Sequence, residues 1–297
     1  MTPGLGLEGR QVAVLGVADS DSIAWGIAKA FLEHGARVTI GYQQRFFSRI
    51  RPLLQQHPEL RGARCDVLVD AELGAFFESY RESGLDVLVH SIAFAAPEMF
   101  AGRPSDVGAE AFAQATTISA HSLAKVVRFA RPHFRPWASV MSVTFQASAR
   151  AVPMYGLMGA AKAALECIVR YLALELGEQR VRVNAISPGA VATLATMGPS
   201  LAFVRDPETL ARMRGDMFRE AVAAARAEHG AGADEVALAQ AAWLHVQKTF
   251  AGQAAIPELI SKEDVAGTAL YLGSDLSRKV TGQVLHVDGG LSSVLIF

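Results

Sequence analysis

The chain has 297 residues and a formal net charge of −1, and 51% of its residues are hydrophobic. This charge balance offers no electrostatic footprint for nucleic acid, and the apolar content argues against disorder. The two cysteines, Cys65 and Cys167, lie too far apart to support a disulfide framework or a CxxC metal site. Because no apolar stretch is long enough to span a membrane and residues 1–10 lack a signal pattern, we expect a cytoplasmic protein that binds no membrane or metal.

Short apolar runs alternate with longer helical patterns along the chain. Strands are predicted at residues 11–15, 37–41, 62–66, 85–91, 138–143, 181–187 and 282–288. Helices are predicted near residues 22–35, 45–56, 70–83, 108–131, 154–177 and 262–274. Apolar runs without polar alternation are typical of strands that helices cover on both faces. The alternation predicts a single α/β domain over 1–297, with a Rossmann-type, doubly wound, seven-stranded parallel sheet and helices on both faces.

Residues 190–258 interrupt this alternation, because they contain no strand pattern. Residues 206–230 are predicted to form a helix, which Asp206 can cap and Gly230 can end, and 233–250 a second helix. This helical insertion fits a lid over a substrate pocket and fits equally a packing or oligomerisation element. Apolar residues of the insertion that could line a pocket are Met197, Leu201, Phe203, Met213, Met217 and Phe218.

The first predicted strand runs into the stretch "GVADSDSIAWG" at residues 16–26. Gly16 can form a tight turn, Ser22 can cap the following helix, and Gly26 allows close helix–strand packing. The start of that helix would attract a phosphate. The usual GxGxxG fingerprint is absent, so the stretch alone also fits an ordinary strand, turn and capped helix.

Further segments resemble one family in the same order along the chain. The turn at 16–26 resembles that of the enoyl-acyl-carrier-protein reductases, a divergent branch of the short-chain dehydrogenase/reductase superfamily. Segments similar to that family are "CDV" (65–67), "VHSIAFA" (89–95), "YGLMGAAKAALE" (155–166), "VRVNAIS" (181–187), "EDV" (263–265) and "GQVLHVDGG" (282–290). The resemblance covers most of the chain and is weakest in the insertion.

Tyr155 and Lys162 are the candidate catalytic pair. They are seven residues apart, about two helical turns, so one predicted helix would place both side chains on one face. This spacing resembles the pair of the enoyl reductases, whereas ordinary short-chain dehydrogenases separate the two residues by four. The resemblance implies transfer of hydride from NADH or NADPH to the β-carbon of an enoyl thioester, carried on acyl carrier protein or coenzyme A. Tyr155 would then hydrogen-bond the thioester oxygen, and Lys162 would orient the nicotinamide ribose.

The resemblance also assigns the two binding sites. Residues that would hold the dinucleotide are Gly16, Ser22, Ile23, Gln43, Asp66, Val67, Ser91, Ile92, Ala93, Lys162, Ile186, Pro188 and Thr193. Residues that would line the substrate pocket are Phe94, Ala95, Phe145, Tyr155 and Met158. The neutral Gln43 favours NADH, while the neighbouring Arg45 keeps NADPH open.

Two departures from the family pattern leave alternatives open. Phe145 stands where many members carry a second tyrosine, and it removes a hydroxyl from the pocket. Ser142 lies thirteen residues before Tyr155, where carbonyl-reducing relatives keep a serine that binds the substrate oxygen. A carbonyl reductase using Ser142, Tyr155 and Lys162 is therefore the second hypothesis, and a nucleotide sensor without turnover is the third. The resemblance also implies a homotetramer, built partly on helices at 108–131 and 154–177.

Overall fold

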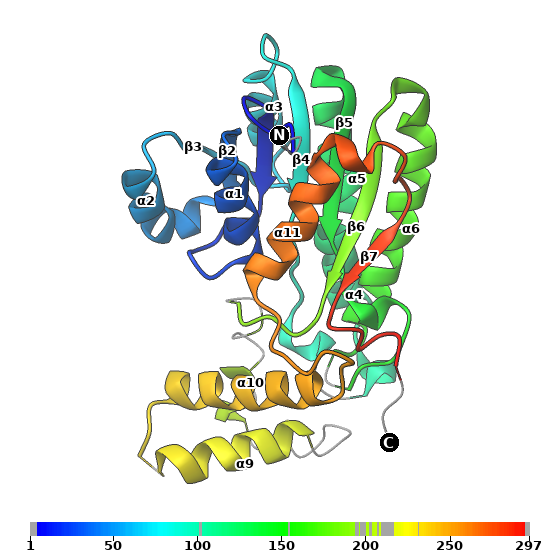
Figure 1. Ribbon diagram of the computed structural model, residues 1–297. Coiled ribbons are helices and arrows are strands. Elements are labelled where there is room, and N and C mark those ends of the chain that lie inside the picture. The colour runs from blue at the N-terminus through cyan, green and yellow to red at the C-terminus, as the bar shows by residue number, and fades with distance from the viewer. Residues whose placement is uncertain are drawn as a thin grey trace.

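Seven parallel strands form the centre of the computed structural model, which describes residues 5–100, 103–153, 155–193, 196, 200–201, 204–206, 208, 217–230 and 232–294. The strands are β1 (Gln11–Leu15), β2 (Arg37–Tyr42), β3 (Arg61–Arg64), β4 (Leu85–His90), β5 (Phe134–Val143), β6 (Arg182–Pro188) and β7 (Val284–Val287). Their order across the sheet is β3-β2-β1-β4-β5-β6-β7, which confirms the predicted doubly wound sheet (Figure 1). The order reverses between β1 and β4, so a ligand crevice is expected at the carboxyl ends of these two strands.

Helices cover both faces of the sheet (Figure 1). Apolar side chains of α1 (Ile23–Glu33), α2 (Phe47–Gln56) and α11 (Lys262–Gly273) form one buried core with the sheet. Those of α3 (Asp70–Glu78), α5 (Ser122–Ala130) and α6 (Met158–Leu176) form the core on the opposite face. Both faces of the sheet are thus buried, which explains why β1, β4 and β6 are buried along almost their whole length.

The single helix expected near 108–131 is wrong in one respect. The structure divides it into α4 (Ala109–Thr116), a π-helical turn (Thr117–His121) and α5. Such turns insert an extra residue into an α-helix and occur frequently at functional sites. This one faces the segment that follows β4, described below.

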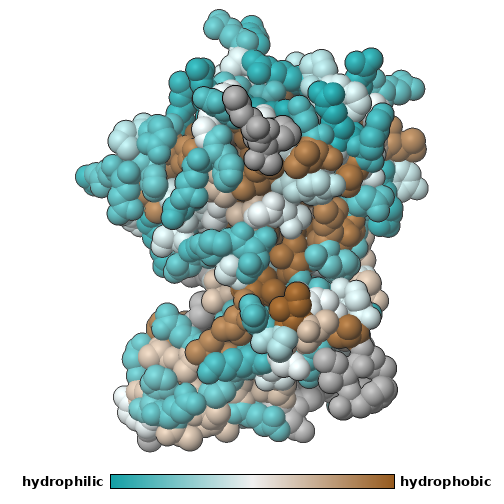
Figure 2. Space-filling view, viewed as in Figure 1, coloured by the Kyte–Doolittle hydropathy of each residue, from teal (hydrophilic) through white to brown (hydrophobic). Residues whose placement is uncertain are grey.

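The insertion forms a helical hairpin at the carboxyl edge of the sheet (Figure 1). Its helices, α9 (Met217–His229) and α10 (Glu235–Gly252), share a separate apolar core. Asp234 caps α10 by accepting hydrogen bonds from two backbone N–H groups, both at 3.2 Å. Gly230, with φ of +81°, ends α9 as predicted, and the first part of the helix predicted over 206–230 lies largely outside the described residues. Figure 2 shows hydrophobic side chains gathered where the hairpin meets the sheet.

In the described part of the chain, every helix is too short or too polar to cross a membrane.

Candidate functional site

Gly16 forms the turn directly after β1. Its φ is +98°, and a Cβ at this position would lie 2.1 Å from the carbonyl oxygen of Ser91. Beside it, the Ser91 N–H donates to the Leu15 carbonyl at 3.0 Å, which ties the end of β4 to the end of β1. Only glycine therefore fits here, because the Ser91 backbone occupies the place of a side chain at the point where the strand order reverses.

Ser22 caps α1, as predicted. Its hydroxyl accepts a hydrogen bond from the Trp25 N–H at 3.2 Å and donates to the Asp19 carbonyl at 2.8 Å. Ile23 is half-buried and begins the helix. Because the Ser22 hydroxyl already has two partners within the turn, the backbone N–H groups at the start of α1 are the better candidates for holding a phosphate.

Gln43 and Asp66 meet at the carboxyl ends of β2 and β3. The Gln43 side-chain amide donates to one oxygen of the Asp66 carboxylate at 2.9 Å, and the Leu68 N–H donates to the other at 2.9 Å. Val67 is buried beside them, and Arg45 is exposed with its guanidinium 4.8 Å from the Phe46 ring. The pairing places a carboxylate next to Gln43, the residue that was predicted to favour NADH.

The segment after β4 is held by Ser119, a residue that no sequence motif singled out. Ser91 and Ile92 are half-buried and Ala93 is exposed. The buried Ser119 hydroxyl, on the π-helical turn, accepts from the Phe94 N–H at 3.0 Å and donates to the Phe94 carbonyl at 2.9 Å. No local pattern marks Ser119, because its partner lies 25 residues away.

Lys162 lies on α6 and is only 4% exposed. Its Nζ donates to the Val143 carbonyl, at the end of β5, over 2.9 Å. Burial lowers the pKa of Lys162 to about 8, although the nearby Glu166 carboxylate acts in the opposite direction. This buried cation therefore lies at the carboxyl edge of the sheet, on the side that the topology assigns to ligands.

Tyr155 does not lie on the same helix as Lys162, so this part of the prediction is wrong. It precedes α6 in a turn, and Gly156 follows with φ of +54°. A Cβ at Gly156 would lie 2.0 Å from the Met99 carbonyl, so this glycine admits that backbone and prevents the helix from extending to Tyr155.

The phenol of Tyr155 makes no hydrogen bond to any side chain or backbone group among the described residues, and burial raises its pKa above the usual value. Its ring packs against Phe145, with ring centroids 4.7 Å apart, and against Phe100 at 5.9 Å. The phenol is therefore a neutral donor held by two aromatic rings.

The predicted pocket residues adjoin Tyr155. Met158 is buried in a cluster that also contains Ala95, Phe100 and Tyr155, whereas Phe94 remains exposed. Phe100 also packs against the core of the α9–α10 hairpin. Of the insertion residues that were expected to line a pocket, Leu201, Met217 and Phe218 belong to this hairpin core, and Met197, Phe203 and Met213 lie outside the described residues.

Ser142 is buried in β5, where its hydroxyl contacts His90. Its hydroxyl donates to the His90 carbonyl at 3.1 Å and lies 3.0 Å from His90 Nδ1, while His90 Nε2 lies 2.8 Å from the Ser122 hydroxyl. Burial, together with the Lys162 charge, lowers the pKa of His90 to about 3, so this imidazole stays neutral. These contacts favour a structural role for both Ser142 and His90.

The loop after β6 is tied to the insertion. Ile186 and Pro188 are buried at the end of this strand, and the Thr193 N–H donates to the Thr196 hydroxyl at 3.0 Å. From α10, the buried Gln247 side-chain amide donates to the Ala190 carbonyl at 2.9 Å. Gln247 therefore links the hairpin to the loop that was predicted to hold part of the dinucleotide. The two residues are 57 positions apart, so no local pattern predicts this link.

Replacing Gln247 by alanine is expected to lower the free energy of unfolding by about 1–3 kcal/mol, because the Ala190 carbonyl loses its buried donor. The dissociation constant for a pyridine nucleotide should rise severalfold as this loop relaxes. Urea denaturation and fluorescence titration measure the two effects. Gln240→Ala, at an exposed position of the same helix, is the matched control and should change stability by less than about 0.5 kcal/mol. Equal effects of both substitutions would contradict the link.

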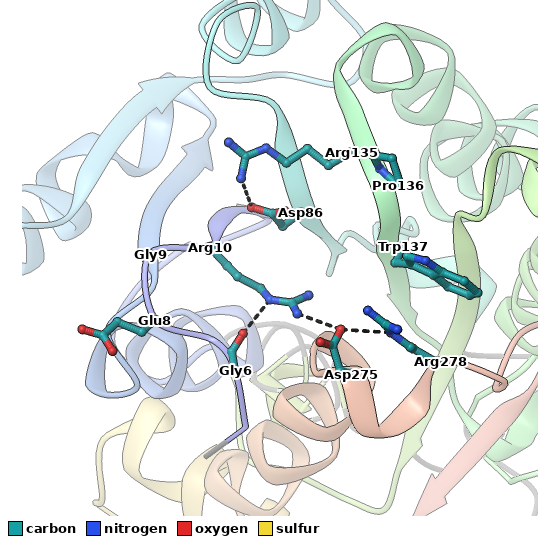
Figure 3. Close-up of a pocket in the computed structure, with 10 residues that line it drawn as sticks. All are labelled: Gly6, Glu8, Gly9, Arg10, Asp86, Arg135, Pro136, Trp137, Asp275 and Arg278. Atoms are coloured by element: carbon teal, nitrogen blue, oxygen red, sulfur yellow. Dashed lines mark hydrogen bonds and ion pairs between the residues drawn. The ribbon is translucent and has the colours of Figure 1, made fainter. Parts of the chain in front are cut away.

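A depression of about 320 Å³ lies at the opposite, amino edge of the sheet (Figure 3). Arg10 and Arg278 pair with Asp275 at 2.8 and 3.5 Å, and Arg135 pairs with Asp86 at 3.2 Å. None of the predicted site residues lines it. Because each arginine already has a carboxylate partner, we interpret this depression as an ion-pair network that joins segments near the two chain ends to the sheet.

Comparison with known proteins identifies relatives over the whole chain. The family model described as enoyl-(acyl carrier protein) reductase matches residues 16–228 and 231–292. The enoyl-[acyl-carrier-protein] reductase [NADH] FabI of Enterococcus faecalis is 35% identical over 288 residues, covering 96% of this chain and 98% of the relative. The protein of the same name from Synechocystis sp. is 34% identical over 295 residues, covering 96% and 97%.

Solved structures of such enzymes also superpose on the fold. The enoyl-(acyl-carrier-protein) reductase of Anaplasma phagocytophilum, in complex with NAD, has a TM-score of 0.80 at 31% identity and covers 100% of this chain and 98% of its own. The NADH enzyme of Aquifex aeolicus has a TM-score of 0.79 at 31% identity, with coverage of 99% and 100%. The chain therefore belongs to the enoyl-(acyl carrier protein) reductase family.

Proposed function

We propose that this protein is an NADH-dependent reductase of trans-2-enoyl thioesters carried on acyl carrier protein, acting in fatty-acid or specialised acyl-chain biosynthesis. The observation that carries the proposal is the juxtaposition of the unpartnered Tyr155 phenol with an aromatic cluster at the sheet edge that holds the buried Lys162, within the part of the chain that the structure describes. Membership of the enoyl reductase family supports the reaction type.

The residues at the carboxyl edge fit a dinucleotide. The absence of a side chain at Gly16 lets the ends of β1 and β4 come together at the point where the strand order reverses, and the capped start of α1 supplies backbone N–H donors for a phosphate. The Asp66 carboxylate, hydrogen-bonded to Gln43, would repel a 2′-phosphate, which favours NADH over NADPH. Ile23, Val67, Ile92, Ala93, Ile186, Pro188 and Thr193 complete the proposed binding surface.

When bound, the reduced nicotinamide supplies the hydride that the substrate β-carbon accepts. Negative charge then develops on the thioester oxygen, and Tyr155 donates a hydrogen bond to that oxygen. A proton delivered from water or through Tyr155 to the α-carbon completes the reduction. Because its pKa is raised, the phenol remains protonated at neutral pH and can act as a donor. Phe145 and Phe100 pack against the ring and hold it in place.

Lys162 has two tasks in this proposal. Its ammonium, held by the Val143 carbonyl, orients the ribose hydroxyls and favours charge development next to Tyr155. Phe94, Ala95 and Met158 would enclose the enoyl group, and Phe100 connects them to the hairpin core, which would receive the acyl chain.

The contacts of Ser142 separate this proposal from carbonyl reduction. For an enoyl reductase, Ser142→Ala should lower stability by about 1–2 kcal/mol through the His90 network and leave turnover within about tenfold. A carbonyl reductase that relies on this hydroxyl would instead lose most of its turnover. Steady-state kinetics and urea denaturation of the variant distinguish the two outcomes.

A homotetramer in the cytoplasm is the assembly we propose. Tyr171 and Leu174 on α6 are 71% and 78% exposed. Two large apolar side chains so exposed on one helix favour a protein–protein interface. Sedimentation velocity should detect a species of four chains, and a profile of monomer alone would contradict this assembly.

The reaction is tested by following NADH and NADPH oxidation with paired enoyl and β-ketoacyl thioesters of the same length. The expected result is NADH oxidation with the enoyl compound only. Oxidation with the ketoacyl compound alone would establish the carbonyl reductase alternative, and tight NADH binding without any turnover would favour a sensor.

A further inference from the structure

Glu166 lies one helical turn after Lys162 on α6, on the same face of the helix. The hydroxyl of Thr144 donates to one oxygen of the Glu166 carboxylate at 2.6 Å. Thr144 is itself buried, and its N–H donates to the Ile186 carbonyl at 2.8 Å, so β5 and β6 hold its position.

The backbone connects these contacts to the candidate catalytic lysine. Val143, which accepts the Lys162 hydrogen bond at 2.9 Å, immediately precedes Thr144. Two consecutive residues at the end of β5 thus hold the ammonium of Lys162 and the carboxylate of Glu166. A movement of either residue would displace both charges.

We propose that Glu166, anchored by Thr144, is a positioning residue that keeps the Lys162 ammonium charged and directed at the ligand crevice. This inference depends on the proposed function in one respect, namely that Lys162 has a role in turnover. In this proposal Glu166 acts through Lys162 and touches neither substrate nor coenzyme, and Thr144 holds one of its oxygens.

The other described groups around Lys162 carry no charge, so the Glu166 carboxylate is the main electrostatic influence on its ammonium. His90, on β4, is neutral, and Tyr155 is a protonated phenol. The 3₁₀ turn Gln146–Ser148 packs against α6 and contains no ionisable residue, and His121 of the π-helical turn is exposed. Among the described residues, Glu166 is the charged group that acts on Lys162, and its field opposes the effect of burial on the lysine pKa.

The sign of the expected effect follows from this balance. The ammonium is lost as the pH rises through the pKa of Lys162, which lies at about 8. Without the Glu166 charge, burial acts unopposed and the pKa falls further. In Glu166→Gln, we therefore expect the Lys162 pKa, and with it the alkaline limb of kcat/KM, to move down by roughly one pH unit.

The direct test is NMR titration of the chain labelled at lysine Cε. The protein has six lysines, and Lys162→Arg assigns the Lys162 signal. The titration needs no coenzyme or substrate. The same variants are then assayed from pH 6 to 10 for enoyl-thioester reduction, with Glu175→Gln as the matched control, because Glu175 is exposed on the same helix and pairs with Arg131 at 3.1 Å.

A lower Lys162 pKa in Glu166→Gln, with no change in Glu175→Gln, supports the proposal. An unchanged Lys162 titration, or a loss of activity that is equal at every pH, overturns it. If Glu166→Gln does not fold, the Lys162 titration is repeated in Thr144→Val, where we expect a smaller downward shift of the Lys162 pKa. A shifted titration in Glu166→Gln, alongside a wild-type chain that reduces no enoyl thioester, would contradict the proposed function and still support the role of Glu166.

Discussion

Replacing Tyr155 by phenylalanine is expected to lower kcat/KM for an enoyl thioester by about 10²–10³-fold, the usual cost of removing one oxyanion donor. The phenol has no other hydrogen-bond partner among the described residues, so its loss leaves no buried group unsatisfied and should not destabilise the fold. The ring contacts with Phe145 and Phe100 remain. The affinity for NADH should therefore change less than about threefold, as measured by fluorescence titration beside steady-state kinetics.

A second tyrosine offers a matched control for this prediction. Tyr271 on α11 is half-buried and lies near Arg182, at the amino edge of the sheet. Tyr271→Phe removes one phenol oxygen at a distance from the proposed site, so it should leave kcat/KM unchanged. Retention of more than a tenth of wild-type kcat/KM in Tyr155→Phe would show that the phenol is not the main oxyanion donor.

The strands and the ends of the helices follow from local sequence signals. Runs such as QVAVL at 11–15 are apolar on both sides of the strand, and the structure buries both sides. Ser22 and Asp234 cap their helices because a short polar side chain there accepts from free N–H groups. These signals lie within a few residues of the feature they determine, so one sequence is enough to detect them.

The hydrogen bonds that hold the site in place, unlike the strands and helix caps, do not follow from local sequence signals. Three hydrogen bonds support the site: the Ser119 hydroxyl accepts from the Phe94 N–H, the Gln247 amide donates to the Ala190 carbonyl, and the Gln43 amide donates to the Asp66 carboxylate. Each of these bonds joins residues far apart in the chain. Serine, glutamine and aspartate also occur on any protein surface, so residue type alone does not distinguish them. The same limit explains the misplaced Tyr155, since the approach of the Met99 backbone to Gly156 stops the helix and cannot be deduced from spacing.

A substitution at Gly16 is the second change with a large expected effect on stability. The position requires both an unusual backbone conformation and the absence of a side chain. An alanine at φ of +98° costs about 1–2 kcal/mol, and overpacking typically adds about 1–3 kcal/mol. Here the added Cβ would lie 2.1 Å from the Ser91 carbonyl, which is backbone and cannot rotate away. We therefore expect Gly16→Ala to lower the free energy of unfolding by about 2–5 kcal/mol, the sum of these two costs.

The ends of β1 and β4 would also have to separate, which would displace the backbone around Ser91 in the proposed nucleotide site, so NADH affinity should fall at least tenfold. Gly9→Ala distinguishes the cost of backbone strain from the cost of a steric clash. Gly9 has φ of +70°, but a Cβ added there would meet no described atom within 4 Å. That control should cost only the backbone strain, about 1–2 kcal/mol, and leave nucleotide binding unchanged. Urea denaturation at matched protein concentration and NADH titration measure both variants. Equal losses in the two would mean that the contact between Gly16 and Ser91 does not shape the nucleotide site.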